Sequence, residues 1–342
     1  MRFSQSIVAV DTHTEGDPTR IIVSGIGNIK GSNMLEKLHF FEKNLDHVRK
    51  ALMAEPRGHK EMYGCVLTEP TIEEADYGII MMDNSGYLSM CGHATIGICT
   101  ALAELGMVET TEPSTRIVLE TPGGLVDANV TMKAGRGESV CYKSVPAYAD
   151  FIDADLVIPG LGKLKVDIAY GGNYFVFFSA EEVDLQVNPQ NMGKIIETGQ
   201  RVKEAAIKQF PVQHPQLQRN NLIGVATILA KPTNPKAIYK NVHVLGSLLT
   251  HSLGGTGARS PGGTGTSALM AVLYAKGKLG LNQEIWVESI TEGLFKGRLL
   301  AETTVGNKKG VIPEITGSAY ITGFHQFILD QQDRLRDGFL IQ

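Results

Sequence analysis

The sequence predicts a fold of mixed helices and strands, built from two similar halves that each bury one helix. Its 342 residues favour two domains. Two nearly uncharged helical segments, 90–108 and 261–279, match each other at a constant offset along the chain. Strand-like and amphipathic segments surround both of them in the same order. We therefore expect a pseudo-symmetric protein in which each half repeats one topology.

The first half has four elements in order. A turn-rich strand entry, THTEGDPTRIIVSG at 12–25, precedes an amphipathic helix at 34–52. The apolar helix MCGHATIGICTALAELGMV at 90–108 comes next, and a β-rich segment follows at 116–126. The corresponding segments of the second half are 169–180, 190–210, 261–279 and 284–295. Alternating strands and helices produce chance matches, but the shared order of four elements favours a true duplication.

The two apolar helices align residue by residue. Each begins with small residues and stops at a glycine suited to the left-handed position after a helix. A helix that is apolar on nearly all sides lies inside a protein, so we expect each one at the centre of its half. The aligned pairs are Cys91 and Gly262, Gly92 and Gly263, Thr95 and Thr266, Leu102 and Leu273, and Gly106 and Gly277.

The domain boundary is predicted near residues 155–165, where proline and glycine interrupt the pattern. This gives an N-terminal domain at 1–160 and a C-terminal domain at 161–342. The segment AYITGFHQFILD, residues 319–330, has the composition of a strand. It is a candidate for a last strand that returns to the first domain.

Composition excludes several classes of protein. The formal net charge of -4 argues against nucleic acid or an anionic membrane as partner. The sequence has no signal-peptide pattern and no apolar stretch of membrane-spanning length, so we expect a cytoplasmic protein. Four scattered cysteines are too few for a disulfide framework. The spacings typical of zinc sites and of phosphate-binding loops do not occur, so no metal or nucleotide site is expected.

The two aligned helix starts indicate a site that binds a carboxylate. The first turn of a helix has unpaired N–H groups and the positive end of the helix dipole, so it attracts carboxylates. Two such starts could hold one substrate carboxylate and stabilise the enediolate-like charge that forms when a neighbouring Cα proton is removed. That step requires a base. Cys91 stands at the first helix start, where a thiol ionises readily.

Each of these residues also has a structural interpretation. Most single cysteines are buried and inert, and we apply that interpretation to the other three, Cys65, Cys99 and Cys141. His93 either contacts the substrate carboxylate, tunes Cys91, or is an ordinary polar residue of the first turn. Functional and structural roles stay equally open for Arg57, for His59 and for the turn 14–17.

Together these residues resemble the proline racemase family, which includes hydroxyproline epimerases and trans-3-hydroxy-L-proline dehydratases. The resemblance extends over most of the chain, and MCGH together with SPxGTGTSA is a specific pair. The motifs that carry it are DTHTEGDPTR (11–20), EPRGHKEMYG (55–64), MCGHATIG (90–97), AYGGNYF (169–175) and RSPGGTGTSA (259–268).

The resemblance implies an α+β fold similar to diaminopimelate epimerase, in which each half wraps a sheet around a central helix. It also implies catalysis without a cofactor or metal, a small proline-like carboxylate as substrate, and a homodimer. The family's racemases use two cysteines on opposite faces of Cα, and the first corresponds to Cys91. The implied carboxylate-binding residues are Gly92, His93, Gly263 and Thr264.

The sequence departs from the family pattern at two places. Gly262 stands where the racemases have their second catalytic cysteine and the dehydratases a threonine. Ala258 stands where the family has an aspartate before Arg-Ser-Pro. Inversion by two bases needs a proton carrier on each face of Cα, which a glycine cannot be. A single base suffices to eliminate a β-hydroxyl group.

On the basis of these two departures, we consider three functional hypotheses in order of preference. The first is a lyase that dehydrates trans-3-hydroxy-L-proline with Cys91 as its single base. The second is a proline or 4-hydroxyproline racemase or epimerase with another second acid. The third is a non-catalytic relative that binds a small carboxylate.

Overall fold

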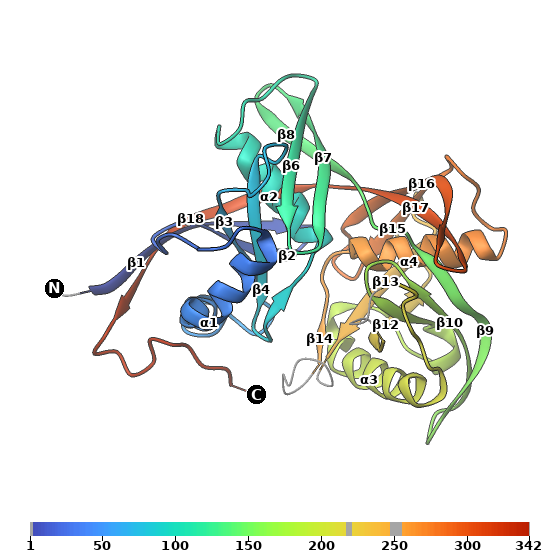
Figure 1. The fold of residues 1–342 in the computed structure, drawn as a ribbon. Coiled ribbons are helices and arrows are strands. Elements are labelled where there is room, and N and C mark those ends of the chain that lie inside the picture. Colours follow the sequence, from blue (N-terminus) through green and yellow to red (C-terminus); the bar gives the residue numbers. More distant parts are fainter. Residues whose placement is uncertain (1–2, 217–220, 247–254, 342) are drawn as a thin grey trace. The chain divides into compact units, whose positions relative to one another are not determined.

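The computed structural model describes residues 3–216, 221–246 and 255–341. The chain forms two compact units, coloured along the sequence in Figure 1. Unit 1 consists of Met1–Tyr142 and Ser318–Gln342, and unit 2 consists of Lys143–Gly317.

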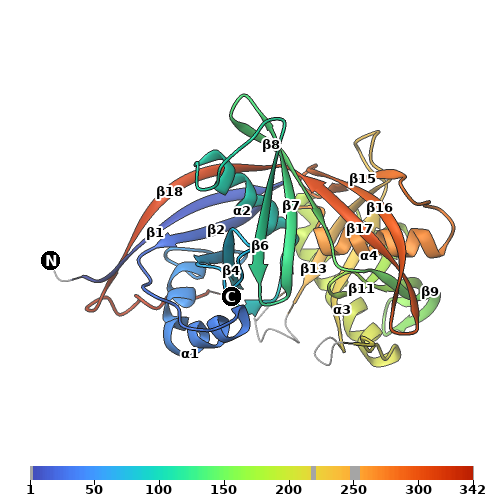
Figure 2. The ribbon, with the colours of Figure 1, turned by 45° about the horizontal axis from the view of Figure 1, so that its top comes forward.

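Unit 1 is one curved sheet with a helix on each face. Its strands are hydrogen-bonded in the order β8-β7-β6-β4-β3-β2-β1-β18, and β5 pairs with β4. Figures 1 and 2 show the last strand, β18, beside the first, β1. The elements are β1 (Phe3–Thr14), β2 (Asp17–Ser24), α1 (Met34–Met53), β3 (Tyr63–Thr68), β4 (Tyr77–Asp83), β5 (Tyr87–Leu88), α2 (Gly92–Glu104), β6 (Ser114–Thr121), β7 (Gly124–Lys133), β8 (Arg136–Lys143) and β18 (Ala319–Asp330).

The helix α2 is the centre of unit 1. It packs against β1, β2, β3, β7 and β18, which come from opposite ends of the strand order, so the sheet curls around it. A Cβ atom on Gly97 would lie 2.5 Å from Thr12 Oγ1, which shows how closely α2 lies on β1. The amphipathic helix α1 contacts β4 and β6 and shares a core with the sheet, in which Phe41 is fully buried. All but the last residue of α2 are buried, as its apolar sequence predicts.

Unit 2 repeats this arrangement. Its strands are hydrogen-bonded in the order β9-β10-β11-β12-β13-β15-β16-β17, and β14 pairs with β13. The elements are β9 (Tyr148–Ile158), β10 (Gly162–Tyr170), β11 (Tyr174–Ser179), η1 (Glu181–Val183), η2 (Pro189–Asn191), α3 (Met192–Gln209), β12 (Ile223–Ala230), β13 (Tyr239–Leu245), β14 (Thr256–Gly257), α4 (Gly263–Ala275), β15 (Glu284–Ser289), β16 (Leu294–Val305) and β17 (Lys308–Gly317).

The helix α4 takes the central place in unit 2. It packs against β9, β10, β11, β16 and β17. The backbone of Ala147 pairs with that of Val311, which joins the two ends of the strand order. The amphipathic helix α3 lies on the other face, packed on β12 and β13, with Val202 in its core. The predicted α+β fold, with a sheet around a central helix in each half, is confirmed.

The two units correspond element by element. Parallel pairing joins β2 to β3 and β4 to β6 in unit 1, and β11 to β12 and β13 to β15 in unit 2. The central helices α2 and α4 have 13 residues each. One element changes its place in the chain, because β9 begins unit 2 whereas its counterpart β18 ends unit 1.

The boundary differs from the predicted division at 160. Unit 2 begins at Lys143, and residues 143–160 belong to it. The proline and glycine that suggested a linker, Pro159 and Gly160, form the turn of a hairpin in which β9 and β10 pair in antiparallel register. At the other end, β18 covers the predicted strand 319–330 and pairs with β1.

A buried carboxylate ties one loop to the sheet in each unit. Glu120 of β6 accepts hydrogen bonds from the backbone N–H and the hydroxyl of Thr71. Glu288 of β15 accepts the same two bonds from Thr233. The backbone N–H of Asn234 donates a further bond of 2.8 Å to Glu288, whose carboxylate also forms a 3.0 Å ion pair with Lys240.

Candidate functional site

The start of α2 presents the first candidate group. Cys91 is the residue before the helix and has an extended backbone, with φ of -142°. Both the N–H and the hydroxyl of Thr95 donate to the Cys91 carbonyl, at 3.0 and 2.9 Å, which fixes the first turn. Gly92 and His93 follow and are buried. The N–H groups of a first helical turn have no acceptor within the helix, so they are available to an anion.

Cys91 and His93 form a close pair. Cys91 Sγ lies 3.3 Å from His93 Nδ1, and the His93 side chain is 9% exposed. Burial by itself lowers the pKa of His93, but the negative charge on Cys91, its hydrogen bond and the charge on Asp17 together raise it to about 9. An imidazolium this close to the sulfur stabilises the thiolate.

The sheet of unit 1 holds His93 in place. Asp17 Oδ2, on β2, lies 4.0 Å from His93 Nδ1. The Thr14 hydroxyl, at the end of β1, donates to the His93 carbonyl at 2.8 Å. The ring of Tyr63, on β3, meets the imidazole edge-on at 4.6 Å between centroids. The structure therefore brings the turn 14–17 to the first helix start, where the sequence had left its role open.

The other cysteines lack these features. Cys65 and Cys99 are fully buried, and burial raises the pKa of both thiols. Cys141 is half-buried on β8. Within the described part of the chain, Cys91 is the cysteine that combines a helix start with an adjacent imidazole.

Arg57 contacts the C-terminal segment, and His59 lies at the surface. The Arg57 guanidinium donates to the carbonyls of Arg336 and Ile328 and pairs with Asp333, so it anchors the C-terminal segment. The His59 side chain is nearly half exposed.

The start of α4 is the second candidate. Gly262 precedes the helix with φ of +70°, a backbone conformation that L-residues rarely adopt. Thr266 mirrors Thr95, because its N–H donates to the Gly262 carbonyl at 2.8 Å. Gly263 is buried and Thr264 is half-buried in the first turn. The predicted site residues therefore form two groups, with Cys91, Gly92 and His93 in unit 1 and Gly262, Gly263 and Thr264 in unit 2.

Sequence reasoning did not single out an imidazole beside this second start. His243 of β13 is 4% exposed, and the N–H of Ala258 donates to its carbonyl at 2.9 Å. The available signal was a lone histidine in the apolar strand NVHVL. The constant-offset alignment does not reach it, because the connection from β13 to α4 is longer than that from β4 to α2.

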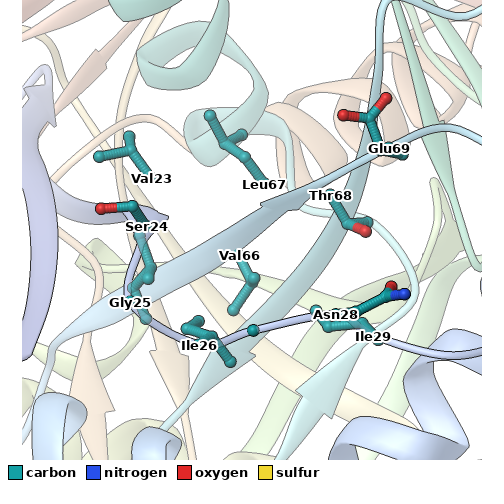
Figure 3. Close-up of a pocket in the computed structure, with 12 residues that line it drawn as sticks. Val23, Ser24, Gly25, Ile26, Asn28, Ile29, Val66, Leu67, Thr68 and Glu69 are labelled. Carbon is teal, nitrogen blue, oxygen red and sulfur yellow. The ribbon is translucent and has the colours of Figure 1, made fainter. Parts of the chain in front are cut away.

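A surface pocket lies elsewhere in unit 1. It is lined by residues 22–29, from the end of β2 and the loop after it, and by residues 66–69 of β3 and its end (Figure 3). Glu69 is its charged lining residue, and none of the predicted site residues takes part.

Neither a cluster of metal ligands nor a membrane-spanning helix occurs among the residues that the structure describes. Residues 3–216, 221–246 and 255–341 contain no group of three His, Cys, Asp or Glu side chains arranged to hold a metal ion. In the same ranges, no helix has both the length and the apolarity needed to cross a membrane.

Comparison with known proteins gives consistent matches. The family model described as proline racemase matches residues 9–340. A proline racemase from Clostridioides difficile is 45% identical over 344 residues, with both chains covered completely. A 4-hydroxyproline 2-epimerase from Streptosporangium roseum is 40% identical, again with full coverage of both. The crystal structure of a hydroxyproline epimerase from Agrobacterium vitis, with bound trans-4-hydroxy-L-proline, matches with a TM-score of 0.87 at 28% identity, covering 100% of this chain and 96% of that one.

Proposed function

The chain belongs to the proline racemase family, and from that premise we propose that it is an isomerase that inverts Cα of a proline-type amino acid. Cys91 is the base on one face of the substrate. The observation that carries this proposal is the 3.3 Å contact between Cys91 Sγ and His93 Nδ1 at the start of a buried helix. The names of the relatives, racemase and epimerase, support the reaction class.

In the proposed reaction, the Cys91 thiolate takes the Cα proton and becomes a thiol. The electron pair moves onto the substrate carboxylate, which becomes enediolate-like. Backbone N–H groups at Gly92 and His93, and at Gly263 and Thr264, hold that charge because helix starts favour anions. A proton delivered to the opposite face of Cα then gives the inverted product, and this second delivery distinguishes an isomerase from a lyase.

The Cys91→Ser variant tests this function. In D2O, the native protein is expected to replace the Cα proton of L-proline or trans-4-hydroxy-L-proline by deuterium and to invert the centre. The variant is expected to lose at least about 100-fold in rate, because a hydroxyl is a far weaker base at neutral pH. Proton NMR follows the exchange, and chiral chromatography follows the inversion.

The matched control is Cys141→Ser, which removes another thiol, remote in sequence from the helix starts, and is expected to retain the native rate. Undiminished exchange in Cys91→Ser would exclude Cys91 as the base. The absence of exchange with every proline isomer in the native protein would exclude the proposed reaction itself.

A second candidate function is favoured by one observation, the glycine at position 262. With no proton delivery on the opposite face, the carbanion formed by Cys91 expels the β-hydroxyl as hydroxide, which takes a proton from solvent and becomes water. The substrate would be trans-3-hydroxy-L-proline, and the reaction would be a dehydration. The same NMR experiment separates the two functions, because dehydration removes the Cβ proton signal of the saturated ring as well as the Cα signal.

The proposed homodimer is tested separately. Light scattering on the purified protein gives its mass in solution, to be compared with the chain mass of 37.0 kDa.

A further inference from the structure

The last strand of the chain, β18, forms an edge of the sheet in unit 1. It pairs with β1 on one side, and in the described ranges no other strand is paired with it (Figure 2). An edge strand presents backbone N–H and C=O groups to which an added strand can bond. Because Arg57 donates to the Ile328 carbonyl near the end of β18, we define the edge segment as residues 319–327, AYITGFHQF.

The edge segment carries two exposed aromatic rings. Phe324 is 68% exposed and Tyr320 is 52% exposed. In the register with β1, Phe324 lies opposite Val10 and Tyr320 lies opposite His13, with a β-bulge between the two pairs. Even- and odd-numbered residues of β1 point to opposite faces of the sheet, and paired residues share a face. Each face of the sheet therefore has one exposed ring at this edge.

The corresponding strand of unit 2, β9, is protected. Its exposed Asp153 and Asp155 form ion pairs with lysines. The Val157 N–H donates to Gln209 Oε1 at 3.1 Å, and the Val157 carbonyl accepts from Nε2 at 2.7 Å, so a side chain of α3 occupies backbone groups there. Charged residues, prolines and covering groups keep strand edges from pairing with other chains. The edge segment of β18 contains no Asp, Glu, Lys, Arg or Pro.

A second copy of the edge segment is a partner of matching chemistry. Two identical edge strands related by a two-fold axis can pair in antiparallel register. The segment has no acidic or basic residue except His325, whose Nε2 lies 3.3 Å from Asp11 Oδ2 of its own unit. No uncompensated like charges would therefore meet across the axis. If β9 paired with its own copy, the carboxylates of Asp153 and Asp155 would be brought close to those of the other copy.

The two rings also supply contact area. A large aromatic side chain buries about 150–250 Å² when it is fully covered. More than half of each ring is exposed, so two copies would bury roughly 500 Å² of additional aromatic surface at this edge. That is about a third of the ~1,600 Å² of a standard interface. The exposed Thr322 and Gln326 of the same segment would extend the contact.

We propose that residues 319–327 of β18 pair in antiparallel register with the same residues of a second copy, and that this strand pair is the interface of the homodimer. The inference rests on the homodimer proposed above and names the surface that forms it. It is independent of the reaction assigned to Cys91. In the pair, the edge backbone groups of each β18 bond to those of the other, and Tyr320 and Phe324 lose their exposure to water.

The test uses Phe324→Lys, which changes an exposed side chain and places a charge from each copy at the proposed interface. Light scattering of the native protein is expected to give twice the chain mass of 37.0 kDa. In the variant, the dissociation constant of the dimer is expected to rise at least about 100-fold, because like charges that meet at an interface cost several kcal/mol. The matched control is Val157→Lys, an equally exposed position on β9, which is expected to remain dimeric.

Amide hydrogen exchange of the native protein locates the interface without any substitution. The amides of residues 319–327 are expected to exchange slowly in concentrated solution and faster after dilution below the dissociation constant of the dimer. A dimer whose exchange in this segment does not respond to dilution would overturn the interface and leave the homodimer intact. A native protein that is monomeric at every concentration would overturn both. Assemblies larger than a dimer would overturn the closed two-fold pairing.

Discussion

At the scale of single residues, the first helix start depends on a charge pair. The His93 imidazole is buried, and burial alone would keep it neutral near pH 7. The adjacent Cys91 and the nearby Asp17 reverse that tendency. The protonated imidazole therefore depends on negative charge from both neighbours.

The pKa of His93 is expected to fall when Cys91 becomes serine. In the native protein it is raised to about 9, because negative charge on Cys91 favours the imidazolium. Removing that charge leaves the charge on Asp17 as the opposing contribution to burial, which lowers the pKa. Histidine NMR over pH 5–10 gives the midpoint, and Cys99→Ser, a change about two turns further along the same helix, is the control. An unchanged midpoint in Cys91→Ser would mean that the sulfur is not charged.

Sequence reasoning identified some of these residues and missed others for physical reasons. Cys91 and Gly262 were found because a helix start is a local feature that the repeat displays twice. Asp17 and Tyr63 reach His93 from other strands, so only the tertiary fold brings them there. His243 was missed because its contact with Gly262 joins a strand to a helix start across a connection of different length in the two halves.

At the scale of elements, the buried carboxylates of β6 and β15 fasten loops to strands. Burial by itself raises the pKa of Glu288, but hydrogen bonds from Asn234 and Thr233 and the contact with Lys240 lower it overall. A carboxyl with a lowered pKa in the folded state stabilises the fold above its unfolded pKa of about 4.3, and that contribution is lost as the pH falls through the folded pKa.

Glu288→Gln is expected to lower the free energy of unfolding at pH 7 by about 1–3 kcal/mol, because a neutral amide meets the same N–H donors less well. The difference from the native protein should shrink as the pH falls below 4. Urea unfolding at several pH values measures both effects. Glu284→Gln changes an exposed residue of the same strand and should cost less than about 0.5 kcal/mol. An equal loss in the free energy of unfolding for the two variants would show that the hydrogen bonds of Glu288 to the loop do not stabilise the fold.

Element-level prediction was accurate where periodicity was strong. The predicted helices at 34–52 and 190–210 correspond to α1 and α3, which pack on the outer faces of their sheets. The predicted boundary failed because Pro159 and Gly160 form a hairpin turn, and a turn within a sheet has the same composition as a linker. Strand pairing decides between the two, and pairing is a long-range property.

At the scale of the whole molecule, unit 2 is one continuous segment and unit 1 is not. A fragment of residues 143–317 is therefore expected to unfold cooperatively on its own. A fragment of residues 1–142 lacks β18, which leaves one side of β1 unpaired and removes a strand that packs on α2. It should aggregate or remain unfolded. Circular dichroism and thermal unfolding of each fragment give the answer.

The control joins residues 1–142 to 318–341 through a short glycine-serine linker. A linker of several residues suffices because the Ser318 hydroxyl donates to the Glu138 carbonyl at 2.9 Å, and Glu138 is four residues before Tyr142 on β8. Cooperative folding of this joined fragment, but not of residues 1–142, would confirm the need for β18. A stable fragment of residues 1–142 would show that β18 is dispensable.

The late position of β18 has a consequence during protein synthesis. Domains usually fold in the order in which the ribosome makes them, beginning at the N-terminus. Here, every residue of unit 2 is translated before Ala319, the first residue of β18. Unit 2 can therefore fold before β18 is made, whereas unit 1 lacks that strand until translation reaches its last residues. The half that carries Cys91 is translated first and completed last.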